Sequence, residues 1–309
     1  MEKRILIAVD DSIHSRRAVE YAIKMGSIIK DLHYMLLNIQ PKISEFLIED
    51  AKKDPKARSA LKEINEKNQE NSTNILNDLK SVMAKSGIDE NLVETITQPV
   101  VKGTAKGILD YGKQSLCDAI VIGKRGISRL TEAFTGSVTN SVLEYTDRIP
   151  VWAVGGEIKT TKIMVAIDGS ESALKAVDHI AFMIGGNSEV KVTLLHVTPK
   201  LRDYCTIEFD EEGDMIEDVI TQGDKKCVES FYIHAKQKFT EAGLSDSQID
   251  IKEVESTLKI GKTIVEEAKK GEFGTLVVGR RGVNNSFFMG SASRNVLTNA
   301  PDCAVWLVP

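Results

Sequence analysis

Short apolar runs alternate along the chain with longer segments in which apolar residues recur at helical spacing. Residues 5–9 form the first apolar run, and the segment after it places Ala18, Ala22, Ile23 and Met25 near one helical face. Further predicted strands are 36–39, 93–97, 119–122, 151–154, 163–167, 190–197, 249–254, 276–278 and 304–308. Because parallel strands need crossover connections, this alternation predicts a doubly wound α/β fold, with a parallel sheet covered by helices on both faces.

The pattern of predicted strands and helices occurs twice along the chain. RILIAVDDS at 4–12 returns as KIMVAIDGS at 162–170, and AIVIGKRG at 119–126 returns as TLVVGRRG at 275–282. Later in each half, TGSVTNSVL returns as MGSASRNVL, and IPVWAV returns as CAVWLV. Several matches in one unbroken order indicate a duplication. We therefore predict two repeated domains, at 1–156 and 157–309.

Each predicted domain carries a charged segment between its second strand and its second helix, at 41–58 and at 200–218. Two interpretations stay open for both segments. They are solvated connections or helix extensions, or they form a lid or a partner surface near the strand ends.

Composition narrows the class of protein. The 309 residues carry a formal net charge of −5, which does not favour a nucleic-acid partner. No apolar run approaches the ~18 residues that a membrane span needs, and the first residues do not resemble a signal peptide. Four cysteines form no CxxC pair, which is typical of reduced thiols. We therefore expect a cytoplasmic protein with no membrane or nucleic-acid partner.

A carboxylate follows the first predicted strand of each domain, as Asp10 and Asp168. In open α/β sheets, ligands bind beyond the carboxyl ends of the strands. Such a side chain can cap the next helix, or it can face the crevice and meet a nucleoside or a hydrated Mg²⁺. We predict the second role for Asp10.

A glycine-rich stretch, GKRGISRLTEAFTGS at 123–137, follows the fourth predicted strand. Gly123 and Gly126 allow positive φ angles and a close approach of ligand to backbone, while Lys124 adds positive charge. Gly136 and Ser137 open a helix whose first N–H groups lack intrahelical partners, which favours a bound phosphate. The alternative is a glycine turn followed by an ordinary capped helix.

Together, Gly-x₂-Gly-x₉-Gly-Ser after VIG and the early VDDS resemble the ATP-binding members of the universal stress protein family, and the duplication resembles their two-domain members. The resemblance implies a five-stranded parallel sheet of order 3-2-1-4-5 in each domain, with the domains pairing through VWAV and VWLV. It implies that Asp10 and Ile39 contact the adenosine. It also implies that the ribose and phosphates contact Gly123, Gly126, Gly136, Ser137 and Val138.

The second domain keeps the pattern with a shorter loop. Only seven residues separate Gly282 from Gly290, against nine in the first loop, which removes up to ~7 Å of extended chain. We therefore expect stronger ATP binding in the first domain and weak or altered binding in the second. The second-domain residues that correspond to the first site are Asp168, Val197, Gly279, Gly282, Gly290 and Ser291.

No catalytic motif accompanies these features: GxxxxGK[ST], GxGxxG, HExxH and GxSxG are all absent from the sequence. The resemblance therefore favours an ATP-binding regulator or sensor of the stress response, with AMP or ADP as further ligands and no strong enzymatic activity. Two alternatives stay open. One is a slow Mg²⁺-dependent ATPase or phosphotransferase in which Asp10 holds the metal, and the other is an interaction module without nucleotide. A further homodimer and a regulatory protein partner also stay open.

Overall fold

Strands and helices alternate through both halves of the chain, as the apolar pattern predicts. The computed structural model describes residues 1–125, 137–198, 211–255, 259–281, 289–300 and 302–309. The first-half strands are β1 (Lys3–Ala8), β2 (Leu32–Ile39), β3 (Val93–Gln98), β4 (Ala119–Lys124) and β5 (Val151–Gly155). The second-half strands are β6 (Ile163–Ile167), β7 (Val192–Thr198), β8 (Ile249–Glu255), β9 (Thr275–Gly279) and β10 (Ala304–Val308).

The helices occupy the intervals between these strands. Those of the first half are α1 (Ile13–Gly26), α2 (Glu45–Ala51), α3 (Pro55–Lys85), η1 (Glu90–Leu92), α4 (Thr104–Gln114) and α5 (Ser137–Tyr145). Those of the second half are α6 (Glu171–Ile184), α8 (Glu211–Glu241), η2 (Asp246–Gln248), α9 (Ile260–Lys270) and α10 (Ser291–Asn299).

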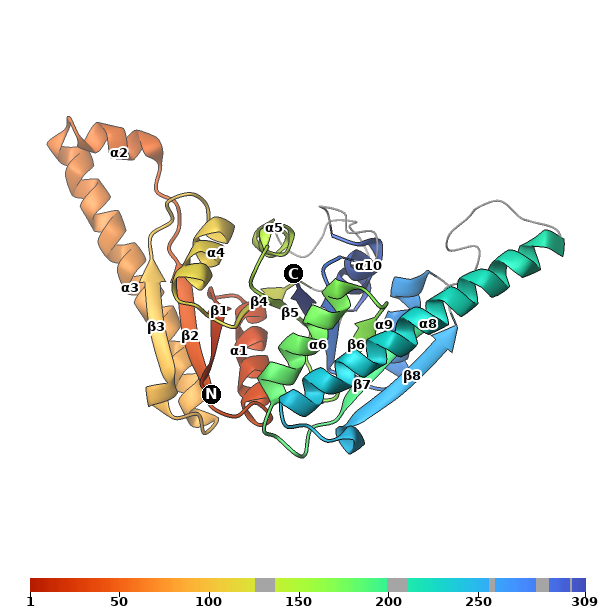
Figure 1. The fold of residues 1–309 in the computed structure, drawn as a ribbon. Helices are drawn as coiled ribbons and strands as arrows, with labels where there is room; N and C mark the ends of the chain where they lie inside the picture. The colour runs from red at the N-terminus through yellow and green to blue at the C-terminus, as the bar shows by residue number, and fades with distance from the viewer. Residues whose placement is uncertain (126–136, 199–210, 256–258, 282–288, 301) are drawn as a thin grey trace.

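All ten strands belong to one sheet, in the order β3-β2-β1-β4-β5-β10-β9-β6-β7-β8 (Figure 1). Each half therefore has the predicted order 3-2-1-4-5, and every pairing within a half is parallel. The two halves meet through β5 and β10, which pair antiparallel. The predicted fold class and the pairing of the two repeats are confirmed.

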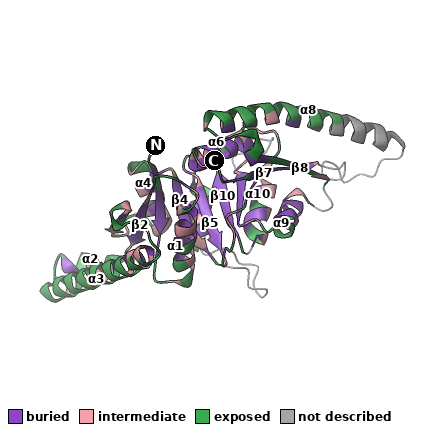
Figure 2. Ribbon diagram, turned by 90° about the horizontal axis from the view of Figure 1, so that it is seen from below, coloured by how far each residue is buried: buried purple, intermediate pink, exposed green. Residues whose placement is uncertain are grey.

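Alternate residues of each strand face two different hydrophobic layers. In β1, Ile5 and Ile7 pack in the layer that includes α1, α3, α6 and α8, whereas Leu6 and Ala8 pack in the layer of α4, α5, α9 and α10. The central strands are therefore buried on both faces, as Figure 2 shows, whereas the outer strands β3 and β8 are mostly exposed or half-buried. This two-sided burial explains why the strands read as continuous apolar runs rather than as alternating ones.

The first charged segment, 41–58, is helical. It forms α2 and the first turn of α3, and the buried residues of α3 all lie in its second half, from Ser72 to Met83. In the second domain, 199–210 lies outside the described residues and α8 takes up the rest of the segment. The α2–α3 pair and α8 extend beyond the sheet at opposite ends of the molecule (Figure 1). None of the described helices is long and apolar enough to cross a membrane.

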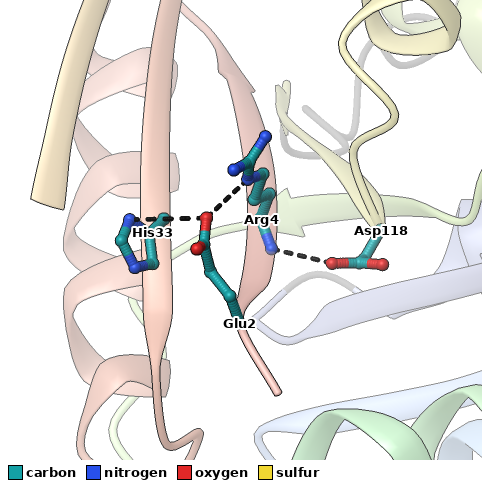
Figure 3. Close-up of polar contacts among 4 residues, drawn as sticks. All are labelled: Glu2, Arg4, His33 and Asp118. Carbon is teal, nitrogen blue, oxygen red and sulfur yellow. Dashed lines mark hydrogen bonds and ion pairs between the residues drawn. The ribbon is translucent and has the colours of Figure 1, made fainter.

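At the amino ends of β1, β2 and β4, polar residues bind one another. The backbone N–H of Arg4 donates to Asp118 Oδ2 at 2.7 Å, and the Asp118 N–H donates back to the Arg4 carbonyl at 2.8 Å. Arg4 Nε donates to Glu2 Oε1 at 2.6 Å, and His33 Nδ1 lies 3.8 Å from the same oxygen (Figure 3). The polar residues at this end of the first-half strands are therefore engaged with one another.

Two stacked tryptophans lie at the centre of the β5–β10 pairing. Trp152 and Trp306 are direct partners in the antiparallel register, and their rings are parallel with centroids 3.8 Å apart. Each indole N–H donates to the first helix of the other domain: Trp306 Nε1 to Tyr21 Oη at 2.8 Å, and Trp152 Nε1 to His179 Nε2 at 3.1 Å. The domains are thus joined by reciprocal bonds through two residues at equivalent positions of the repeat.

His179 is held neutral by this arrangement. Desolvation of the partly buried ring lowers the pKa of the imidazole to about 3, although nearby Asp178 acts in the opposite direction. Protonation of Nε2 would also remove the acceptor that Trp152 needs. The folded state therefore resists protonation of His179, whereas the unfolded chain takes up a proton near the ordinary value of 6.5.

This difference predicts an acid-sensitive interface. The stability contributed by neutral His179 is fully present above pH 6.5 and is lost as the pH falls toward the folded pKa of about 3. A His179→Gln variant keeps an acceptor for Trp152 but does not titrate. Over this range, the wild-type free energy of unfolding should fall by about 1.4 kcal/mol per pH unit more steeply than that of the variant, measured by urea denaturation. Parallel profiles for the two proteins would contradict the prediction.

Candidate functional site

A cavity of about 320 Å³ opens at the carboxyl ends of β1, β2 and β4. Its walls also include the first turns of α1, α4 and α5, so that five separate parts of the first domain contribute to it. The predicted site residues that line it are Asp10, Ile39, Gly123, Ser137 and Val138. The predicted residues Gly126 and Gly136 lie outside the described part of the chain. The structure therefore brings together all of the first-domain site residues that it describes.

Asp10 organises the turn between β1 and α1. Its Oδ1 accepts hydrogen bonds from the Ser12 N–H at 3.1 Å and from the Ser15 hydroxyl at 2.6 Å, while its own N–H donates to Ser15 Oγ at 2.9 Å. Burial alone would raise the pKa of Asp10, but the hydrogen bonds from Ser12 and Ser15 outweigh it and the pKa is lowered. The side chain at this cavity wall is therefore a stable carboxylate. Helix α1 is capped by Ser12, not by Asp10.

Gly123 is required by packing. It lies in β4 without a positive φ angle, and a Cβ built on it would stand 2.4 Å from the His14 carbonyl oxygen. Its own carbonyl accepts a hydrogen bond from the Thr139 hydroxyl at 2.9 Å, which ties the first turn of α5 to the strand. The expected positive φ is thus wrong for Gly123. This glycine lets α1 approach β4 closely, and that approach forms one wall of the cavity.

Positive charge at the cavity comes from Arg125 and from two helix N-termini. Thr104 at the start of α4 and Ser137 at the start of α5 both line it. The N-cap of α4 is Gly103, with φ +98° and no side-chain cap, so the first N–H groups of α4 have no side-chain acceptor there. Two converging N-termini favour an anion, because each carries the positive end of a helix dipole.

Lys124 does not contribute to this charge, contrary to the expectation from sequence. It is only 3% exposed, and its Nζ donates to the carbonyls of Leu297 at 3.1 Å and Ala300 at 2.6 Å in the second domain. The side chain points across the domain boundary because it leaves β4 on the face covered by α10. The sequence gives no indication of this direction.

Thr104 and His14 are among the lining residues that the sequence does not predict. Thr104 is separated from the other motifs by a long stretch of chain, and only the glycine before a short predicted helix hints at its position. His14 follows Asp10 in the first turn of α1, and its buried Nδ1 has no hydrogen-bond partner among the residues that the structure describes. Desolvation, with Arg17 and Arg125 nearby, lowers the pKa of His14 and favours the neutral ring.

A larger groove of about 600 Å³ continues from the cavity between α4 and α5. Thr104, Ser137 and Val138 line both spaces, which therefore adjoin. Lys102 and Lys106, from the start of α4, lie along the groove. A ligand that fills the cavity thus has room for a charged extension toward lysine side chains.

The second domain repeats much of this construction. Asp168 Oδ1 accepts from the Ser170 N–H at 3.1 Å, as Asp10 does from Ser12. His196 Nδ1 lies 3.2 Å from the Ile167 carbonyl, in the place where Asn38 Nδ2 donates to the Val9 carbonyl at 2.8 Å. His196, which precedes Val197, therefore links the ends of two strands. Asn38, which precedes Ile39, does the same in the first domain. This contact gives His196 a structural role at the end of its strand.

The second glycine loop begins and ends as the first does. A Cβ on Gly279 would lie 2.8 Å from the backbone of Ser172, and the Ser293 hydroxyl donates to the Gly279 carbonyl at 2.6 Å. Gly290 is the N-cap of α10, before Ser291, and its N–H donates to the Arg280 carbonyl at 2.9 Å. Gly282 lies outside the described residues. The base of the shortened loop is thus closed by a backbone hydrogen bond.

The described residues contain no group of three or more His, Cys, Asp or Glu side chains that could hold a metal ion. Metal binding at Asp10 stays a prediction.

Comparison with solved structures agrees with this architecture. A universal stress protein from Archaeoglobus fulgidus DSM 4304 superposes with a TM-score of 0.65 at 18% identity, covering 99% of this chain and 97% of that protein. A functionally unknown protein and a putative universal stress protein, both from Pseudomonas aeruginosa, each give a TM-score of 0.56 at 16% identity over 99% of this chain and 92% or 93% of theirs. These similarities show that the two-domain fold is shared.

The family is shown by sequence. No curated protein matches the chain, but the model of the universal stress protein family matches it twice, over residues 1–155 and 159–309. These two matches fall on the two repeats that form the halves of the sheet. The chain therefore belongs to the universal stress protein family.

Proposed function

We propose that this protein binds ATP in its first domain and acts as a nucleotide-dependent regulator or sensor of the stress response. The observation that carries the proposal is the single cavity that joins Asp10, Ile39, Gly123, Ser137 and Val138. These residues are far apart in sequence, and the family resemblance implies the same set for ATP. The protein's place in the universal stress protein family supports the regulatory part of the proposal.

The chemistry of the cavity walls suits each part of a nucleotide. Leu37, Ile39 and Ile108 provide an apolar surface for the adenine base. The ionised carboxylate of Asp10 is an acceptor for ribose hydroxyls. The starts of α4 and α5, with Arg125, favour the phosphates, and AMP or ADP would use fewer of these groups.

The cavity and the adjoining groove also allow Mg²⁺ to enter with the nucleotide. When bound between phosphate oxygens and Asp10, Mg²⁺ would neutralise phosphate charge. The carboxylate suits this role because its hydrogen bonds lower its pKa. Slow hydrolysis is the second candidate function, and it rests on this carboxylate alone.

A cytoplasmic setting and further partners are also part of the proposal. The described cysteines Cys117, Cys227 and Cys303 are free thiols, in keeping with a reducing compartment. The exposed α2–α3 pair, where Phe46 is 84% exposed, offers surface to a regulatory protein or to a second copy of the chain.

ATP with Mg²⁺ should stabilise the wild-type protein by about 2.7 kcal/mol at a ligand concentration 100 times the Kd, because the ligand binds the folded state only. Thermal unfolding with and without ligand measures this. Asp10→Asn keeps the Oδ1 acceptor for Ser12 and Ser15 but removes the charge, and should weaken binding about tenfold. Asp168→Asn is the matched control in the second domain. An unchanged melting temperature in wild type would leave the interaction module as the remaining function.

Phosphate release separates a regulator from an ATPase. If nucleotide only switches the protein, wild type and Asp10→Asn should both release phosphate at the rate of a blank without protein, at ATP concentrations that saturate each. A wild-type rate above the blank that Asp10→Asn abolishes would establish the hydrolytic alternative.

The two domains can be compared through their loops. Gly136→Val should abolish most ATP binding, because the family resemblance implies that Gly136 contacts the ribose and phosphates. Gly290→Val should have little effect on the total affinity. Gly290 has φ −59° and ψ 150°, which valine adopts readily, so this variant tests added bulk rather than backbone strain. Isothermal titration of both variants with ATP measures these affinities. Loss of ATP binding only in Gly290→Val would show that the second domain, not the first, is the main ATP site.

A further inference from the structure

Each domain sends one buried cation into the other. Arg280, directly after β9, is 7% exposed, and its Nη2 donates to the Glu144 carbonyl at 2.6 Å in the last turn of α5. Lys124, at the end of β4, donates in the same way to the Leu297 and Ala300 carbonyls at the end of α10. Lys124 and Arg280 occupy equivalent positions in the repeat, in AIVIGKRG and TLVVGRRG. The contacts are therefore reciprocal.

The two helices that receive these bonds are the ones that begin at the glycine loops. The start of α5 lines the first-domain cavity with Ser137 and Val138, and α10 starts at the corresponding Ser291. Each helix has only nine residues, a length that does not hold a helix in place by itself. Its last carbonyls lack intrahelical partners, and a cation satisfies them and complements the negative end of the dipole.

The two ends of α5 are thus fixed by different domains. The Thr139 hydroxyl ties its first turn to Gly123 of its own domain, and Arg280 holds its last turn from the second domain. In α10, Ser293 and Lys124 do the same with the domains exchanged. Moreover, Lys124 lies between Gly123 and Arg125, which both line the cavity. A ligand that fixes these neighbours also fixes the residue that holds α10.

We propose that Arg280 and Lys124 are positioning residues. Arg280 of the second domain holds α5 in place at the first-domain nucleotide cavity, and Lys124 makes the stability of α10 depend on whether that cavity is occupied. The first part concerns the ligand-free protein, and the second part rests on the proposed binding of ATP. The inference makes the second domain a component of the first-domain site, independent of whether its own shortened loop binds nucleotide.

Hydrogen exchange of the ligand-free full-length protein tests the first part. In Arg280→Met, the amides of α5 should exchange about tenfold faster than in wild type, because the last turn loses its capping cation. Arg280→Lys should restore slow exchange. Arg281→Met is the matched control: it removes the same charge one residue away, where no hydrogen bond to α5 is made, and α5 should exchange at the wild-type rate. Lys124→Met should accelerate amide exchange in α10 in the same way.

Equal α5 exchange in Arg280→Met and Arg281→Met would overturn the proposal. If Arg280→Met does not fold, Arg280→Gln, which keeps a neutral donor, replaces it in the same comparison. Faster exchange across the whole second domain, with α5 unchanged, would show that Arg280 is only a packing residue of its own domain and would also overturn it.

Addition of ATP with Mg²⁺ tests the second part. In wild type, ATP should slow exchange in α10 as well as in α5, and in Lys124→Met it should slow exchange in α5 alone. Arg280→Met should bind ATP about tenfold more weakly than Arg281→Met in isothermal titration. If wild type binds no ATP, the proposed function fails, while the ligand-free exchange still decides whether the positioning contacts exist. If ATP binds and slows α5 but not α10 in wild type, the transmission through Lys124 is wrong.

Discussion

The antiparallel pairing of β5 with β10 is the contact on which the rest of the molecule depends. Without it, each five-stranded sheet would expose an apolar edge strand whose five residues are all buried in the structure. The pairing converts two edges into the centre of one sheet and stacks Trp152 on Trp306. Because the two rings are direct partners in the antiparallel register, this pairing determines how the two repeats are placed relative to each other. The cross-domain contacts on both faces of the sheet follow from that placement.

The hydrogen bonds between the two domains differ between the two faces of the sheet. On the α1 and α6 face, indole N–H groups donate to Tyr21, which is buried in the core layer, and to His179, which is partly buried beside it. On the α5 and α10 face, Lys124 and Arg280 donate to helix carbonyls near the strand ends. The first set joins the cores, whereas the second reaches the helices that start at the glycine loops. Divergence of the repeat, tyrosine to histidine and lysine to arginine, keeps each bond while changing its chemistry.

The position of the candidate site follows from the unequal edges of the sheet. At the amino edge, Arg4, Glu2 and Asp118 form hydrogen bonds with one another. At the carboxyl edge, strands end in residues that turn into helices, and the starts of α4 and α5 present N–H groups to a cavity. A parallel sheet concentrates such helix starts at one edge, which favours an anionic ligand there.

The sequence by itself determined the alternation of strands and helices and the duplication, because local periodicity and short repeated motifs are visible in a single chain. The strand order, the pairing through the final strands and the gathering of Asp10, Ile39, Gly123, Ser137 and Val138 followed from the resemblance of those motifs to the universal stress protein family. Only the tertiary structure decided the direction of Lys124 and the presence of Thr104 and His14 at the cavity. Those facts depend on which elements lie beside a residue. The neutral state of His179 is of the same kind, because its hydrogen-bond partner Trp152 comes from the other domain and no local pattern in the sequence indicates it.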